Sequence, residues 1–243
     1  MRFITFSNRP MDDDADPSIR RQPRMLRESA AAFGVPLENL CPIGAPHDWT
    51  GGARRVMVLD YLASVPPEEP VLLTDAWDSF FAGAPAEMEA AFRASGSPVL
   101  IQTECNLWPV ETAHLMNHPP APTRFRYACG GGWCGFAGAI RAMFTAEDYW
   151  PKWACCDQAA FDDWVCRHGD LATLDYYCRL FQCLYDDGAT RPMPAVGDVV
   201  RVQDGRVRNT ETDSFPLVVH GGGGFAAAAL NLWDQLKEQR GCK

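Results

Sequence analysis

The stretch "VLLTDAWDSFF", from Val71 to Phe81, decides which fold class we expect. Its first part, Val71–Thr74, is a short apolar run, which is typical of a central strand that is covered on both faces. Asp75 and Asp78 follow at once, with Trp77 between them. In open α/β sheets, ligands bind outside the carboxyl ends of the strands, so these two carboxylates stand where a ligand would lie.

The rest of the chain alternates between strand and helix patterns. Further strands are expected at Arg2–Phe6, Pro98–Glu104, Arg179–Tyr185 and Phe215–His220. Helices are expected at Ile19–Phe33, Ala53–Ser64, Ala84–Gly96 and Asp157–Gly169, and "WCGFAGAIRAMF" turns from extended to helical. This alternation predicts an α/β sandwich with a mostly parallel central sheet flanked by helices. With no repeat and no long linker, we expect a single domain over residues 1–243.

Composition narrows the function classes. The 22 Lys and Arg face 31 Asp and Glu, a formal net charge of -9, whereas nucleic-acid binders are normally basic. The start "MRFITFSNRP" lacks a signal-peptide pattern, and no apolar run reaches the length of a membrane span. The ten cysteines form no CxxC pair, so we expect mostly buried thiols and a cytoplasmic protein.

Asp75 and Asp78 have two interpretations. A carboxylate pair on a tight turn at a strand end can hold Mg²⁺ or Mn²⁺ and leave sites for phosphate oxygens. Trp77 then offers a flat face on which a nucleobase can stack. The alternative is that Asp75 caps the next turn and Asp78 faces water.

The stretch "PLVVHGGGG" strengthens the metal interpretation. It places His220 directly after a second apolar strand and before four glycines that let backbone approach a ligand. An imidazole suits Mn²⁺ as a third ligand. If the two strands are neighbours, Asp75, Asp78 and His220 share one cation.

Six motifs in the same order give the chain a family resemblance. They are TDxxD, "TECNLWP", "GGGWCGFA", "DQ" at a helix start, "LDYYCRLFQ" and "VVHGGGG". The chain resembles the glycosyltransferase domain of procollagen lysyl hydroxylases and the related collagen galactosyltransferase-like enzymes. The resemblance implies a GT-A fold, with a nucleotide-binding half at about 1–110 and an acceptor-side half at about 111–243.

It also implies transfer of glucose or galactose from a UDP-sugar to a hydroxyl acceptor, with Mn²⁺, or else Mg²⁺, as the cofactor. The acceptor would be hydroxylysine or galactosyl-hydroxylysine of a collagen-like protein, or a glycan. The metal ligands implied are Asp75, Asp78 and His220, and the catalytic pair is Asp157 and Gln158. The residues implied for the nucleotide are Ser7, Asn8, Arg55, Thr74, Asp75 and Trp77. Those implied for the sugar and acceptor are Glu104, Trp108, Gly131, Gly132 and Gly221.

Several positions depart from the family pattern on the sugar and acceptor side. Cys156 stands in place of an Asp, Cys129 and Gly130 in place of Asn-Ser, and Gly222 where Asn is frequent. Asp157 is open to several roles: a base, a group that stabilises positive charge at the sugar ring, a holder of a sugar hydroxyl, or a helix cap. Two other function classes therefore remain, a non-catalytic nucleotide-sugar-binding module and a metal-dependent phosphohydrolase.

Overall fold

The structure is a computed structural model that describes residues 1–8, 22–42, 51–109, 117–147, 156–186, 194–222 and 224–241 of the 243-residue chain. The start of the first expected helix, the polar loop after Asn8 and Trp153 lie outside these ranges. So do Cys155 and Cys242. Among the described cysteines, five are buried and three half-buried, which confirms the expected packed thiols.

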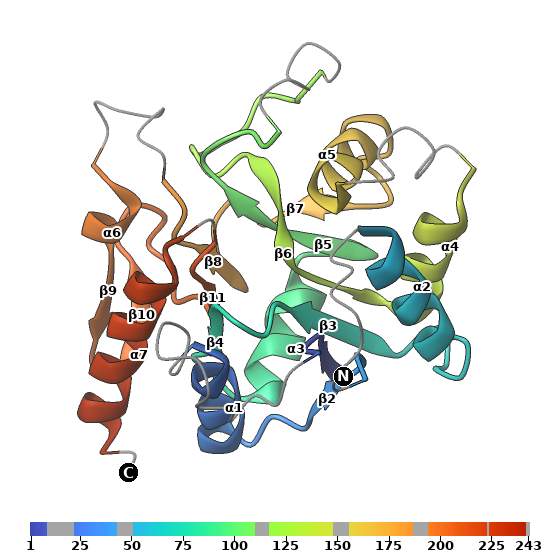
Figure 1. The fold of residues 1–243 in the computed structure, drawn as a ribbon. Coiled ribbons are helices and arrows are strands. Elements are labelled where there is room, and N and C mark those ends of the chain that lie inside the picture. The colour runs from blue at the N-terminus through green and yellow to red at the C-terminus, as the bar shows by residue number, and fades with distance from the viewer. Residues whose placement is uncertain are drawn as a thin grey trace.

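A six-stranded sheet forms the centre of the fold, in the order β2-β1-β3-β6-β5-β7 (Figure 1). Its strands are β1 Arg2–Thr5, β2 Leu37–Asn39, β3 Pro70–Thr74, β5 Val99–Glu104, β6 Tyr127–Phe136 and β7 Thr173–Leu174. All neighbouring pairs are parallel except those made by β6, which runs antiparallel between β3 and β5. The expected mostly parallel sheet is thus confirmed, with one strand inserted in the opposite direction.

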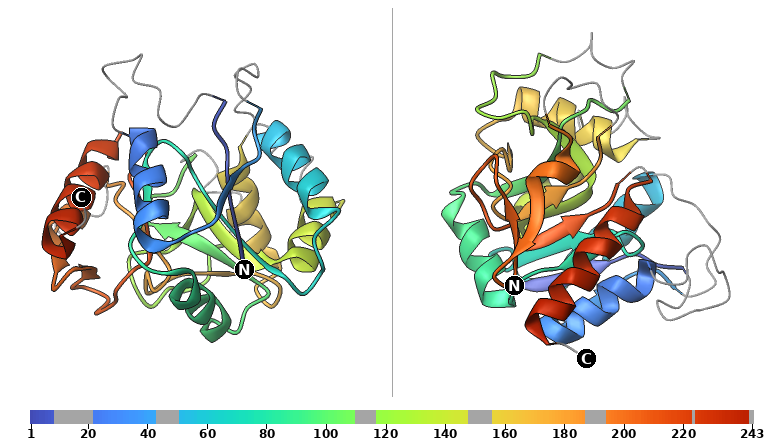
Figure 2. Two further views of the ribbon diagram at one scale, coloured as in Figure 1. Left: turned by 90° about the horizontal axis from the view of Figure 1, so that it is seen from below. Right: turned by 90° about the vertical axis from the view of Figure 1, so that its left-hand side faces the viewer.

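Helices cover both faces of this sheet (Figures 1 and 2). The helices of the fold are α1 Gln22–Phe33, α2 Gly51–Leu62, α3 Pro85–Ala94, α4 Ala137–Thr145, α5 Asp157–Arg167, α6 Val196–Val199 and α7 Ala226–Arg240. The last two, α6 and α7, pack with smaller sheets instead. Strand side chains alternate between faces, so Ile4 and Leu73 pack with α2, α4 and α5. Phe3 and Leu72 point the other way and pack with α1 and α3. Because both faces of these strands are buried, successive residues along them are apolar.

Two smaller sheets complete the fold. One has the order β4-β11-β8, formed by Ser79–Phe81, Val218–His220 and Phe181–Cys183. The other pairs β9 Val200–Gln203 with β10 Arg206–Asn209. Neither sheet, nor the helix α7 that packs with them, was predicted as such from the sequence, although β8 and β11 lie within expected strands.

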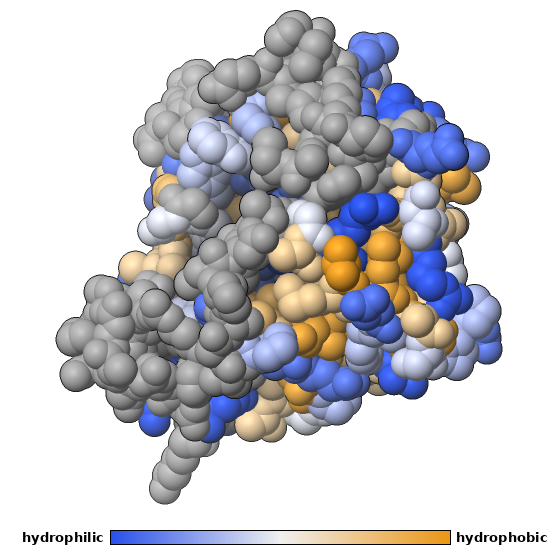
Figure 3. Space-filling view, turned by 45° about the vertical axis from the view of Figure 1, so that its right-hand side comes forward, coloured by the Kyte–Doolittle hydropathy of each residue, from blue (hydrophilic) through white to orange (hydrophobic). Residues whose placement is uncertain are grey.

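The molecular surface carries scattered apolar side chains. Figure 3 shows one face, where a small hydrophobic group is surrounded by hydrophilic residues. Val56 of α2 is among the described large apolar residues that remain exposed, at 55%. Isolated exposure of this kind is normal for a globular protein. Within the described residues, no helix combines the length and the apolar character that crossing a membrane requires.

Asp175 ties the segment between β7 and β8 to the fold. Its buried carboxylate accepts three backbone N–H bonds, from Arg179 at 3.0 Å and from Leu180 and Phe181 at 2.8 Å each. Phe181 begins β8, the strand that lies beside β11. One side chain therefore fixes how the chain enters the small sheet.

We predict that Asp175→Ala lowers the free energy of unfolding by about 3 kcal/mol, because it leaves buried N–H groups without their acceptor. Chemical denaturation of both proteins measures the loss. Asp60→Ala is the control, since Asp60 is exposed on α2, and it should change stability by no more than about 0.5 kcal/mol. Equal effects of the two variants would contradict this role of Asp175.

Candidate active site

The turn after β3 is held in place on two sides. Thr5 Oγ1 donates to the carbonyl oxygen of Thr74 at 2.7 Å, and the backbone N–H of Asp75 donates to the carbonyl of Gly131 at 3.0 Å. Asp75 therefore leaves the sheet at a fixed point between β1 and β6. Asp78 follows one turn later, immediately before β4.

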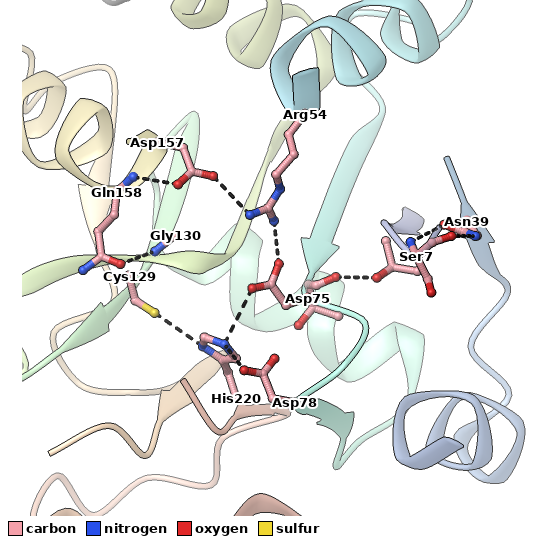
Figure 4. Close-up of polar contacts among 12 residues, drawn as sticks. Ser7, Asn39, Arg54, Asp75, Asp78, Cys129, Gly130, Asp157, Gln158 and His220 are labelled. Carbon is pink, nitrogen blue, oxygen red and sulfur yellow. Dashed lines mark hydrogen bonds and ion pairs between the residues drawn. The ribbon is translucent and has the colours of Figure 1, made fainter. Parts of the chain in front are cut away.

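His220 reaches the same place from the other end of the chain (Figure 4). It ends β11, lies opposite Ser79 of β4, and is followed by Gly221, whose N–H donates to the Asp78 carbonyl at 2.6 Å. The His220 Nε2 atom lies 3.2 Å from Asp78 Oδ2 and 3.7 Å from Asp75 Oδ2. The structure thus brings together the three residues that the sequence predicted as neighbours.

Gly131 makes room for this histidine. A Cβ atom built on Gly131 would stand 2.1 to 2.6 Å from three atoms of the His220 ring. Such distances do not occur between a real Cβ and its neighbours, so any side chain at this position would displace the imidazole. Glycine is required here by close approach rather than by its backbone angles.

The three side chains fit a hard divalent cation. One donor atom from each of Asp75, Asp78 and His220 lies within 4.8 Å of the other two. An octahedral ion with bonds of about 2.1 Å places adjacent ligands about 3 Å apart, close to the observed 3.2 and 3.7 Å. Two carboxylates and an imidazole are donors that suit Mn²⁺, and carboxylates also suit Mg²⁺.

The protonation of the three groups is linked. Burial raises the pKa of Asp75, and the nearby Asp78 adds to the rise although Arg54 opposes it. Burial acts on Asp78 in the same direction, but the contact with His220 outweighs it and lowers that pKa. Burial disfavours the charged imidazole, yet Asp78 and Cys129 outweigh it and raise the pKa of His220 well above its ordinary value. A cation bound here would take the place of the imidazole proton.

Arg54, on α2, links the two sides of the site. Its guanidinium lies 2.5 Å from Asp75 Oδ1 and 3.2 Å from Asp157 Oδ2. The family resemblance pointed instead to Arg55, as a basic residue near the nucleotide. Arg55 Nε donates to the Phe144 carbonyl at 2.6 Å, and its side chain is not part of the cavity wall. The basic group at the site is therefore the neighbour of the predicted one.

Asp157 and Gln158 begin α5 and lie across the site from Asp78 and His220. Asp157 Oδ1 accepts the backbone N–H of Gln158 at 2.9 Å, and Asp157 Oδ2 pairs with Arg54, while the N-cap position of the helix is Cys156. The Gln158 side chain donates to Glu104 and accepts the N–H of Gly130, the latter at 3.1 Å. These contacts join the end of β5 and the start of α5 to an inner residue of β6.

A cavity of about 450 Å³ lies between these groups. Its described lining includes most of the predicted site and five residues that were not predicted as part of it. The predicted residues are Asp75, Asp78, Glu104, Trp108, Gly131, Asp157, Gln158 and His220; the others are Arg54, Cys129, Tyr185 and Gly222, together with Gly130. Cys129, Gly130 and Gly222 stood out in the sequence only as departures from a family pattern, and no local signal marks Tyr185.

The other predicted residues lie behind the cavity wall. Thr74 is buried at the end of β3, and Ser7 exchanges backbone hydrogen bonds with the Asn39 side chain. Trp77 is half-buried and packs against the apolar cluster that contains Phe3. Asn8, Gly132 and Gly221 are likewise buried and outside the cavity lining. The structure does not bring these six residues to the cavity surface. The roles of Ser7, Asn8, Thr74 and Trp77 toward a nucleotide, and of Gly132 and Gly221 toward the sugar and acceptor, stay predictions.

Comparison with known proteins places the chain among transferases. The family model described as "PLOD GT domain" matches residues 27–238. Human "Multifunctional procollagen lysine hydroxylase and glycosyltransferase LH3" is 32% identical over 157 residues, which cover 63% of this chain and 20% of that protein. Mouse "Procollagen-lysine,2-oxoglutarate 5-dioxygenase 1" is 26% identical over 215 residues, covering 82% of this chain and 28% of that protein. The chain thus spans less than a third of the length of either relative.

Solved structures share the fold. Mouse xyloside xylosyltransferase 1 aligns with a TM-score of 0.55 and 11% identity, over 92% of this chain and 98% of that one. A glycosyltransferase involved in the glycosylation of the major capsid of PBCV-1 aligns with a TM-score of 0.50 and 11% identity, over 96% of this chain and 98% of that one. The expected GT-A architecture is confirmed by these neighbours.

We predict that Gly131→Ala weakens binding of Mn²⁺, because the added methyl group forces the His220 ring away from Asp75 and Asp78. Calorimetric titration of Mn²⁺ measures the affinity, and thermal unfolding reports the accompanying loss of stability. Gly197→Ala is the matched control, since nothing lies within 4 Å of a Cβ at that glycine. Unchanged Mn²⁺ affinity in Gly131→Ala would contradict the geometry described for His220.

Proposed function

The chain belongs to the PLOD GT domain family, and we propose that it transfers a hexose, glucose or galactose, from a UDP-sugar to a hydroxyl acceptor. In the reaction, the bond between the anomeric carbon and the diphosphate oxygen breaks. A bond from the acceptor oxygen to that carbon forms, and the acceptor hydroxyl loses its proton. The observation that carries the proposal is the meeting of Asp75, Asp78 and His220 at a cavity with a second group of polar side chains opposite.

Asp75, Asp78 and His220 are the residues proposed to hold the divalent cation, with Mn²⁺ as the expected ion. A cation at this position supplies Lewis-acid stabilisation of the negative charge that develops on the departing diphosphate. The role of the chain is to fix these ligands. The Gly131 carbonyl accepts the Asp75 N–H, and the Asp78 carbonyl accepts the Gly221 N–H. Backbone hydrogen bonds therefore already fix the positions of both aspartates.

Arg54 is proposed as the protein's own positive charge for the diphosphate. Its guanidinium is largely buried, with 15% of the side chain exposed, and it is directed into the cavity by Asp75 and Asp157. A preorganised cation in a partly dry cavity stabilises developing negative charge much more than one in water. Ser7, Asn8, Thr74 and Trp77 are proposed to support the nucleoside, with Trp77 toward the uracil.

The opposite wall is proposed to serve the sugar and the acceptor. Glu104, Asp157 and Gln158 offer carboxylate and amide groups that hold sugar hydroxyls or take up the acceptor proton. Trp108 is 55% exposed at the cavity, as suits an aromatic face against a sugar or peptide. The acceptor proposed is a hydroxyl of a protein or glycan, hydroxylysine of a collagen-like protein being the form suggested by the relatives' names.

One observation favours a second candidate, a nucleotide-sugar-binding module without turnover. Both oxygens of Asp157 are already engaged, one by Arg54 and one by the Gln158 backbone. Glu104 is likewise bonded to Gln158. These contacts give both carboxylates a structural role as acceptors and leave only part of their lone-pair capacity for an acceptor hydroxyl.

We predict that UDP binds in the presence of Mn²⁺ and that removal of the ion by a chelator abolishes binding. Asp75→Asn should abolish Mn²⁺-dependent UDP binding too, because it removes charge from the ligand set. Calorimetry with UDP and release of UDP from UDP-glucose and UDP-galactose are the measurements. Absence of UDP binding with Mn²⁺ present would overturn the proposed function.

We predict that Arg54→Ala and Arg55→Ala differ sharply, although the two residues are adjacent. Arg54→Ala should lower kcat/KM about 100-fold, as removal of one preorganised charge-stabilising group typically does. Arg55→Ala should change kcat/KM only about twofold, since its guanidinium bonds to the Phe144 carbonyl away from the cavity. A larger loss in Arg55→Ala than in Arg54→Ala would reverse the assignment.

We predict that Asp157→Asn separates the two candidates. In an enzyme it should reduce turnover strongly while UDP affinity in Mn²⁺ stays within about threefold of wild type, because Asp157 is not a metal ligand. UDP affinity is measured by calorimetry and turnover by sugar release to water or acceptor. Tight UDP binding in the wild type without turnover of any UDP-hexose would favour the binding module.

A further inference from the structure

A second group of potential metal ligands surrounds the other nitrogen of His220. Cys129 lies on β6, and Cys183 ends β8, directly beside His220 of β11. Cys129 Sγ is 3.4 Å from His220 Nδ1 and 3.8 Å from Cys183 Sγ (Figure 4 shows the first contact). The three donor atoms all lie within 4.8 Å of one another, and all three residues are buried.

These separations match a tetrahedral zinc site. With Zn–S bonds of about 2.3 Å and Zn–N bonds of about 2.0 Å, a tetrahedron places two sulfurs about 3.8 Å apart and a sulfur about 3.5 Å from the nitrogen. The observed distances are 3.8 and 3.4 Å. Two of the three donor separations therefore match those that the ion requires, and the third lies within 4.8 Å.

We propose that Cys129, Cys183 and His220 Nδ1 form a second cation site, selective for a thiophilic divalent ion such as Zn²⁺. Two sulfurs and an imidazole are soft donors that favour Zn²⁺ over Mn²⁺ or Mg²⁺. This site is distinct from the Asp75 and Asp78 side, which uses the other ring nitrogen.

The site has an entry path. Cys129 and His220 line the cavity, so an ion that enters it meets them directly. Glu104 Oε2 lies 3.9 Å from Cys183 Sγ, and the fourth position of a tetrahedral ion is left to water from the cavity. The contact with Cys183 and burial together raise the pKa of the Cys129 thiol well above its ordinary value, so binding releases thiol protons to solvent as the thiolates form.

Asp78 would orient the shared histidine. When Nδ1 binds an ion, the neutral ring carries its proton on Nε2, which lies 3.2 Å from Asp78 Oδ2. A carboxylate that accepts the second N–H of a metal-bound histidine fixes its tautomer and strengthens it as a ligand. The hydrogen bond between His220 Nε2 and Asp78 thus supports an ion at Nδ1. An ion bound by Asp75, Asp78 and Nε2 would replace that hydrogen bond.

The two sites therefore compete for His220. An ion at Nδ1 leaves the Nε2 proton in place, and an ion at Nε2 needs that proton removed. Zn²⁺ at the second site should weaken Mn²⁺ binding at the first, and by linkage Mn²⁺ should weaken Zn²⁺ to the same degree. The cysteine pair thus gives a thiophilic metal a means of inhibiting the cation site.

The test uses Co²⁺ as a spectroscopic probe for Zn²⁺, with the full chain kept reduced. Thiolate ligands give Co²⁺ an intense near-ultraviolet charge-transfer absorption that carboxylate and imidazole ligands do not. We expect this absorption in the wild type, its removal by one equivalent of Zn²⁺, and at least tenfold weaker Co²⁺ binding in Cys129→Ser and Cys183→Ser. Wild-type protein with bound Co²⁺ but no such absorption overturns the proposal, even if a variant fails to fold.

Two further variants serve as controls. Cys134→Ser changes another buried cysteine of β6 and should keep the absorption. Asp75→Asn should also keep it, since Asp75 belongs only to the first site, and this outcome is independent of whether the protein proves to be a transferase. Loss of the absorption in Cys134→Ser, with Cys129→Ser unaffected, would assign the thiolates elsewhere and overturn the proposal.

Competition is measured separately by the Mn²⁺ affinity of the wild type with and without one equivalent of Zn²⁺. We expect a decrease of at least tenfold in the wild type and less than threefold in Cys129→Ser. An equal decrease in both proteins would mean that Zn²⁺ acts at Asp75 and Asp78 instead, which contradicts the shared histidine.

Discussion

The close approach of His220 to the backbone of Gly131 is the constraint on which the site depends. Gly131 accepts the Asp75 N–H through its carbonyl and admits the imidazole because it has no side chain. One residue of β6 thus fixes both the acidic turn after β3 and the histidine after β11. This is possible because β6 lies antiparallel between β3 and β5, which places Gly131 beside the carboxyl end of β3.

Local sequence patterns were sufficient to find the three proposed cation ligands. Val71–Thr74 and Leu217–Val219 are short apolar runs, and a buried strand must end in residues that can meet water or a ligand. Each run is followed by a residue with metal-binding chemistry, so a single assumption, that the two strand ends are neighbours, gives the site. The pairing of β11 with β4, directly after Asp78, supplies that neighbourhood.

Features that depend on packing between distant elements could not be predicted. Arg54 and Arg55 are consecutive on α2, and which of them faces Asp75 depends on how that helix is rotated against the sheet. No pattern in the residues of β6 indicates that this strand runs antiparallel to its neighbours. Cys129 and Cys183 are separated by 54 positions, and only the parallel pairing of β8 with β11 brings the second thiol to His220. Spacing within one segment carries no information about such contacts.

The charge distribution around the cavity explains why a cation belongs there. Among the described residues of its lining, four carboxyl groups, of Asp75, Asp78, Glu104 and Asp157, face the guanidinium of Arg54 and the imidazole of His220. Arg54 is already shared between two of those carboxylates. A diphosphate brought into this cavity would meet an excess of negative charge at short range, where the low local dielectric makes repulsion strong. The divalent ion proposed at Asp75, Asp78 and His220 would offset this negative charge together with Arg54, and on that proposal whatever withdraws His220 from the ligand set also weakens donor binding.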